Sequence, residues 1–284
     1  MFAPKFISAP LKAIPTLTIS LMLMLSSAHP TQGSNFVQAD VDLNERPAAL
    51  EPPSGLNHEQ GNLITETETF FRPPSNPKPR SGPRTTTGTR QGGCLGNTET
   101  AFTIFGPDAV IGRTVSTHPE FVWHLPASET TFPVIFRLLA PNESGIPEPI
   151  HVTELSYTSG FIKYQLPANV QALAPGIEYR WQVIIECNPN YPSQALVQER
   201  SLEVVSSPAS LSQALATATT DSQRALAYGN QGLWYDAIAQ VAQATTADGK
   251  QTRSGLLRDL AALVAPDQEQ LSQNIIEIAE ATAN

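Results

Sequence analysis

The strongest constraint on the fold is a series of short segments in which apolar and polar residues alternate. Phe121, Trp123 and Leu125 lie two residues apart, which would place them on one face of a β-strand. The pattern recurs in further segments separated by turn residues: 132–138, 151–157, 161–166, 178–187 and 196–205. Such spacing is typical of an antiparallel β-sandwich, so we expect roughly six or seven strands over residues 94–207, with Trp123 and Trp181 in the core.

A turn before the fifth of these segments adds a more specific signal. Leu173, Pro175 and Gly176 precede Tyr179 in the sequence Leu-Ala-Pro-Gly-Ile-Glu-Tyr. This sequence resembles the tyrosine corner of fibronectin type III and immunoglobulin-like domains, in which the tyrosine hydroxyl binds upstream backbone. Counting by twos from Tyr179 puts Cys187 on the same, inward face at the end of the strand. In antibody domains the tyrosine lies only two residues before the cysteine, so the antibody pattern itself is absent.

After Ser207-Pro208 the apolar period lengthens to three or four residues, which predicts helices over residues 208–284. Two of these helices are expected near 254–264 and 268–281. Six residues fall at the offsets of one tetratricopeptide repeat: Tyr228, Gly232, Trp234, Ala237, Val241 and Ala244. The predicted fold class is therefore α+β, an immunoglobulin-like sandwich followed by a small helical bundle resembling such a repeat.

One helical repeat cannot bury its own apolar face, so it should dock on the sandwich or on a partner. The aromatic residues Tyr228, Trp234 and Tyr235 are candidates for a partner surface. The alternative is that Trp234 and Tyr235 are buried against the sandwich.

The first 28 residues have the pattern of a signal peptide. Lys5 and Lys12 precede an uncharged apolar stretch at 17–25, and Ser26-Ser27-Ala28 offers small residues for cleavage. The apolar stretch is shorter than the roughly 20 residues that a permanent membrane helix needs. We therefore expect an exported protein, located in the periplasm or outside the cell, with no stable membrane span after cleavage.

Residues 29–93 are rich in proline and poor in apolar residues, which predicts a disordered linker. The second part of this linker is basic, with no acid between Phe70 and Gly93. Its charged residues are Arg72, Lys78, Arg80, Arg84 and Arg90. They could hold an anionic polymer of the cell envelope, or the segment could be a solvated spacer.

Export also decides how Cys94 and Cys187 are interpreted. In an oxidising compartment an even pair of cysteines usually forms a disulfide, whereas in a reducing cytosol the same residues would be free thiols or part of a metal site. We therefore predict a disulfide between Cys94 and Cys187.

The sequence offers no recognisable catalytic, cofactor or metal motif. It contains no Gly-x-Ser-x-Gly elbow, no P-loop and no Gly-x-Gly-x-x-Gly, and its five histidines lack metal-ligand spacing. A net charge of −9 argues against nucleic-acid binding, because that requires a basic surface. No catalytic, cofactor or metal-binding residue is predicted.

The order of these features is similar to that of an exported cyanobacterial family known as domain of unknown function 928. The resemblance covers roughly residues 90–265 and is carried by three segments: Gly92-Gly93-Cys94-Leu95, the strand from Tyr179-Arg180-Trp181 to Cys187-Asn188-Pro189, and Gly232-Leu233-Trp234-Tyr235-Asp236-Ala237. It implies an exported protein with paired cysteines and a β-then-α body, and it brings no activity.

The leading functional hypothesis is a non-catalytic envelope protein that binds another protein or a surface polymer. The alternative is a secreted hydrolase or glycan-processing enzyme whose site is assembled from distant loops. A cleft with two carboxylates, or a histidine beside a serine, would favour the alternative.

Overall fold

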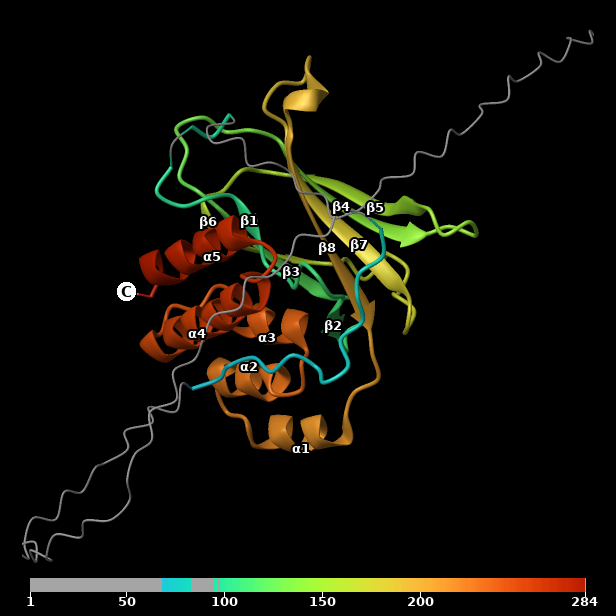
Figure 1. Cartoon of the computed structure of the whole chain (residues 1–284), viewed down its shortest axis with the longest axis vertical. Helices are drawn as coiled ribbons and strands as arrows, with labels where there is room; N and C mark the ends of the chain where they lie inside the picture. The colour runs from blue at the N-terminus through green and yellow to red at the C-terminus, as the bar shows by residue number, and fades with distance from the viewer. Residues whose placement is uncertain (1–67, 83–93, 97, 284) are drawn as a thin grey trace, which may run out of the picture. The chain divides into compact units, whose positions relative to one another are not determined.

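The computed structural model describes residues 68–82, 94–96 and 98–283, which contain eight β-strands and five α-helices (Figure 1). The predicted signal peptide at 1–28 lies outside the described residues, as do residues 29–67 and 83–93 of the predicted linker. No helix in the described ranges is long and apolar enough to cross a membrane.

The strands form two sheets. The larger has the order β2-β8-β7-β4-β5 and comprises β2 (Gly112–Thr114), β8 (Leu196–Val204), β7 (Glu178–Ile185), β4 (Val134–Pro141) and β5 (Pro147–Leu155). The smaller has the order β1-β3-β6 and comprises β1 (Thr103–Ile104), β3 (Glu120–Leu125) and β6 (Gly160–Gln165).

The prediction of a purely antiparallel arrangement is wrong in one place, because β2 runs parallel to β8 with Gly112 opposite Leu202. Both β1 and β2 are too short to produce an alternating pattern in the sequence, so neither was predicted.

Aromatic side chains fill the space between the sheets. The ring of Phe121 on β3 lies 4.8 Å from that of Phe136 on β4 and 5.0 Å from that of Trp181 on β7. Trp123 and Trp181 are both buried, as predicted. The other face of β3, which includes Val122, is buried as well, and α3 (Trp234–Val241) packs against both β3 and β2. Figure 1 shows the helices gathered on one side of the molecule and most of the larger sheet on the other.

The chain is helical after residue 208, as expected. In addition to α3 the helices are α1 (Ala209–Thr217), α2 (Asp221–Gly229), α4 (Ala247–Val264) and α5 (Glu269–Ala281). Helix α2 begins at a capping box formed by Thr220 and Gln223. Helix α4 begins at Ala247, earlier than expected, because the side chain of Thr246 accepts a hydrogen bond from the Gly249 amide and caps it.

Residues 68–82, which we call the strap, correct the prediction that the whole of 29–93 is a disordered linker. The strap runs from the helices to the larger sheet (Figure 1, cyan). Phe71 is buried with its ring 5.1 Å from that of Trp234, and Pro79 forms a β-bridge with Val110. The adjacent Phe70 and Phe71 supply apolar contact that the average composition of the linker concealed.

Candidate functional site

The aromatic residues predicted as a partner surface lie mostly inside the molecule. Trp234 and Tyr235 are buried, so their interpretation as a partner surface is wrong. The Tyr235 hydroxyl donates a hydrogen bond to the Ser201 carbonyl at 2.9 Å and accepts one from Trp181 Nε1 at 3.0 Å. These bonds connect α3 to β7 and β8. They explain why the aromatic side chains of α3 point into the molecule.

Asp236 forms a second connection between α3 and the larger sheet. Its carboxylate accepts hydrogen bonds from the Val115 amide at 3.0 Å and the Thr114 hydroxyl at 3.1 Å. Burial raises the pKa of Asp236 to about 6, against the effect of these two hydrogen bonds. Tyr228, the third predicted partner residue, is half-buried, and burial raises the pKa of its phenol.

Two of the three basic residues of the strap, Lys78 and Arg80, have ion-pair partners within the molecule. Lys78 forms an ion pair with Glu203, and Arg80 forms one with Glu199 in which both side chains are buried. Both acids are buried under the strap. Each acid also pairs with an arginine of the larger sheet, Glu203 with Arg113 and Glu199 with Arg180, so the anion-binding interpretation of Lys78 and Arg80 stays a prediction. The other arginines of that patch are exposed or lie outside the described residues: Arg72 in the first case, Arg84 and Arg90 in the second.

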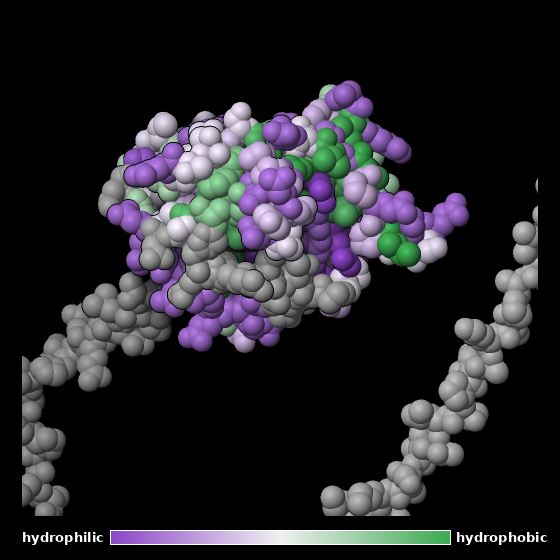
Figure 2. All heavy atoms as spheres, turned by 90° about the horizontal axis from the view of Figure 1, so that it is seen from above, coloured by the Kyte–Doolittle hydropathy of each residue, from purple (hydrophilic) through white to green (hydrophobic). Residues whose placement is uncertain are grey.

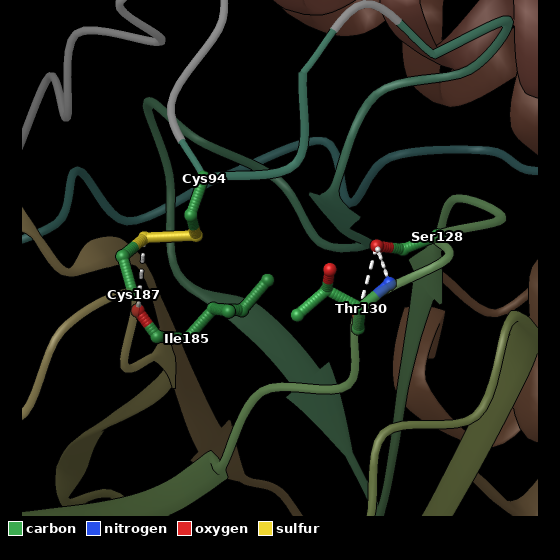
Figure 3. Close-up of a disulfide and its surroundings, with 5 residues drawn as sticks. All are labelled: Cys94, Ser128, Thr130, Ile185 and Cys187. Carbon is green, nitrogen blue, oxygen red and sulfur yellow. Dashed lines mark hydrogen bonds between the residues drawn. A yellow bond between two sulfur atoms is a disulfide. The ribbon is translucent and has the colours of Figure 1, made fainter.

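The predicted disulfide between Cys94 and Cys187 is present (Figure 3). It joins the segment before β1 to the residues just after β7, and the two Cα atoms are 5.3 Å apart. Figure 3 also shows the nearby turn in which the Ser128 hydroxyl donates a hydrogen bond to the Thr130 carbonyl at 2.8 Å.

The turn before β7 places its four predicted residues as follows. The Tyr179 hydroxyl accepts a hydrogen bond from the Ala174 amide at 2.9 Å, and the Tyr179 ring is buried. Leu173 is buried, whereas Pro175 is exposed and forms a bridge to β8. Gly176 has a φ of +77°, which few residues other than glycine adopt.

Exposed aliphatic side chains gather along β5, the edge strand of the larger sheet. Ile146, Ile150 and Val152 are 58%, 44% and 53% exposed, and we call these three residues the β5 patch. Strongly apolar residues are visible at the surface of the molecule in Figure 2, next to hydrophilic ones. The patch was not predicted, although the alternation of Ile150 and Val152 is present in the sequence.

The free edge of β5 is protected against the addition of another strand. Pro147 and Pro149 have no amide hydrogen to donate. The register with β4 shifts between these prolines and His151, which leaves Ile150 as an extra residue in the strand. A partner would therefore contact the side chains of the β5 patch rather than extend the sheet.

A pocket of about 620 Å³ lies where β4 begins and β5 ends. Its lining residues come from the segment just before β4 and from the end of β5 with the residues after it: Thr131, Phe132, Pro133, Glu154, Leu155, Ser156 and Tyr157. The Tyr157 hydroxyl donates to the Pro126 carbonyl at 2.8 Å, and burial raises the pKa of Tyr157 to about 12. Among these lining residues Glu154 is a carboxylate without a second one beside it, so the pocket lacks the carboxylate pair of a glycoside hydrolase.

Metal-binding groups do not converge in the described ranges, where no three histidine, cysteine, aspartate or glutamate side chains could hold an ion together. His124 is buried beside the Phe161 ring, and burial lowers its pKa. It therefore remains neutral at neutral pH.

The fold and these sites define a disulfide-bonded α+β protein in which an N-terminal strap ties the helices to the larger sheet. The chain belongs to the family described as Domain of Unknown Function (DUF928), whose model matches residues 85–272. This match confirms the family resemblance seen in the sequence. No curated protein and no solved structure matches the chain.

Proposed function

We propose that this chain is an exported, non-catalytic binding module that contacts a partner protein through the β5 patch. The observation that carries the proposal is the exposure of Ile146, Ile150 and Val152 on one strand and its adjoining turn. Clustered exposed aliphatic side chains mark interaction sites on proteins that are otherwise well packed. A pocket lined in part by Glu154 and Leu155 lies at the end of the same strand.

A protein fits this surface better than an anionic envelope polymer. Aliphatic side chains contribute to binding by leaving water, which a protein partner with its own apolar surface permits. An anionic polymer binds through cations, and two of the three in the strap, Lys78 and Arg80, already have carboxylate partners.

The disulfide supports export, because such bonds persist in oxidising compartments. The signal peptide predicted at 1–28 agrees with this, and the final location would be the periplasm or the exterior of the cell. The hydrogen bond from the Ala174 amide to Tyr179 supports an immunoglobulin-like origin for the sandwich. The packing of α2 on α3 across the turn at Gly232 supports a tetratricopeptide-like origin for the hairpin.

The proposal is tested by cross-linking the tagged full-length chain in cells of its source and identifying the products by mass spectrometry. Val152→Lys places a charge in the β5 patch. The matched control is Ile276→Lys, because Ile276 is an exposed isoleucine on α5. A partner recovered with the wild-type chain and the control, but lost with Val152→Lys, is the expected result. A partner retained by both variants, or lost from both, would contradict the proposal.

A further inference from the structure

The pocket between the beginning of β4 and the end of β5 contains a carboxylate without a partner. Glu154 is exposed, and its side chain forms no hydrogen bond or ion pair within the described ranges. Arg137, a base on the neighbouring strand β4, lies opposite Val152 and forms no ion pair with Glu154. The hydroxyls of Thr131 and Ser156, which also line the pocket, have no hydrogen-bond partner among the residues that the structure describes. The polar groups of the pocket are therefore open to a ligand.

The backbone hydrogen bonding between β4 and β5 stops at the pocket. Val134 is the residue of β4 nearest the pocket that pairs with β5, and the preceding Pro133 carbonyl faces β7, where it accepts a hydrogen bond from the Glu186 amide at 3.0 Å. Since every second residue of a strand bonds to the same neighbour, Phe132 and Tyr157 would form the next pair. In the described part of the chain, neither residue has a backbone hydrogen bond. Their carbonyl oxygens therefore remain as acceptors at the pocket.

Two aromatic rings line the same pocket. The rings of Phe132 and Tyr157 meet edge to face with their centroids 6.5 Å apart, and both side chains are half-buried. The hydrogen bond from the Tyr157 hydroxyl to the Pro126 carbonyl holds the tyrosine ring in place. Aromatic faces attract cations, and the planar guanidinium group of arginine also stacks on them. The rings thus add to the attraction that the Glu154 carboxylate exerts on a cation.

These groups together select the chemistry of the ligand. An anion would meet the like charge of Glu154, and the chain as a whole carries a net charge of −9. A guanidinium group has five donors and no acceptor, which suits a pocket whose carboxylate, backbone carbonyls and hydroxyls can all accept. An ammonium group is a compact, strongly hydrated charge without the flat shape that stacks on a ring.

We propose that the pocket binds the guanidinium group of an arginine on the partner protein that contacts the β5 patch. Val152 and Glu154 are both exposed and lie two residues apart on the same face of β5, so the apolar contact and the arginine contact are adjacent. The inference rests on the proposed function and names the chemistry that the partner must carry. The partner would present aliphatic side chains with an arginine beside them.

Three short peptides test the ligand chemistry on the full-length chain. Acetyl-Ala-Arg-Ala-amide is compared with the same peptide containing lysine and with one containing citrulline, the uncharged analogue of arginine. Binding is followed by the NMR shifts of the backbone amides that line the pocket, at positions 131, 132 and 154–157. We expect the arginine peptide to bind at least about fivefold more tightly than either of the others. A lysine or citrulline peptide that binds as tightly, or the absence of shifts at these amides, would overturn the proposal.

Two variants test the role of the carboxylate. Glu154→Gln removes the charge and keeps the size of the side chain, and the fold should be retained because Glu154 is exposed and has no partner in the described ranges. The matched control is Glu148→Gln, because Glu148 is an exposed acid near the other end of β5 and its bond from Asn142 Nδ2 can also be accepted by an amide oxygen. The arginine peptide should lose its advantage with Glu154→Gln and keep it with Glu148→Gln. The same affinity for both variants would refute the role of Glu154.

Cross-linking in cells separates this inference from the proposed function. We expect Glu154→Gln to lower the yield of the partner adduct at least about fivefold, and Glu148→Gln to leave it unchanged. An adduct kept at full yield by Glu154→Gln but lost with Val152→Lys would overturn the arginine contact and leave the proposed function intact. An adduct that survives both Val152→Lys and Glu154→Gln would contradict the proposed function and the arginine contact together.

Discussion

Arg80→Ala should destabilise the chain far more than a surface arginine would. Arg80 and Glu199 form an ion pair between two buried side chains, and Glu199 also accepts a hydrogen bond from Gln182 at 2.8 Å. Removing one partner of a buried pair typically costs 3–5 kcal/mol, because a charge remains buried and uncompensated. Arg180 stays within 3.6 Å of the same carboxylate, so we expect the lower end, about 3 kcal/mol.

The assay is urea denaturation at pH 7, followed by the fluorescence of the buried tryptophans. Arg72→Ala is the matched control, because Arg72 lies in the same strap with an exposed side chain. Arg72→Ala should lower the free energy of unfolding by no more than about 0.5 kcal/mol. A double-mutant cycle that adds Glu199→Gln should give a coupling energy of about 1–3 kcal/mol. Equal losses of unfolding free energy for Arg80→Ala and Arg72→Ala would refute the assignment of the strap to the folded part of the chain.

Three further predictions concern other stabilising interactions: the disulfide, the Tyr179 hydrogen bond and the Asp236 carboxylate. Cys94→Ser should lower the free energy of unfolding by about 4 kcal/mol, because the disulfide to Cys187 closes a loop across 93 positions, and thermal midpoints that are equal with and without reductant would contradict this. Tyr179→Phe should cost about 1 kcal/mol through loss of the bond from the Ala174 amide, and an unchanged denaturation midpoint would show that the bond contributes nothing. Burial raises the pKa of Asp236 in the folded state from 3.8 to about 6, so its stabilising contribution is present below pH 4 and is lost as the pH rises through 6. Asp236→Asn should therefore flatten the dependence of unfolding free energy on pH between 4 and 7, and identical pH profiles for the two proteins would disprove the shift.

The sandwich could be predicted because most of its strands carry their own signal. The alternation around Trp123 and Trp181 located β3 and β7 within about two residues at each end. Strand β2 has only three residues, and its parallel pairing depends on contact with β8, which is distant in the sequence. Local patterns carry no information about such a pairing.

The strap and the orientation of α3 could not be predicted for a related reason. Composition averaged over 29–93 indicated disorder, because Phe70 and Phe71 are a small part of a proline-rich segment. Their contacts are with Trp234, Gly255 and Asp259, which lie far along the chain. Likewise, an aromatic helix can face a partner or a sheet, and the sequence alone does not decide between them. The exposure of Val152 likewise depends on how β5 is arranged in the folded chain.

The binding role is tested most directly by a photo-cross-linking amino acid placed at position 152 of the full-length chain in living cells. The same amino acid at position 276 serves as the control, because both positions hold exposed aliphatic side chains in the wild-type chain. The account predicts a defined covalent adduct with one protein from position 152 and none from position 276. The absence of an adduct from position 152, or the same adduct from both positions, would contradict it.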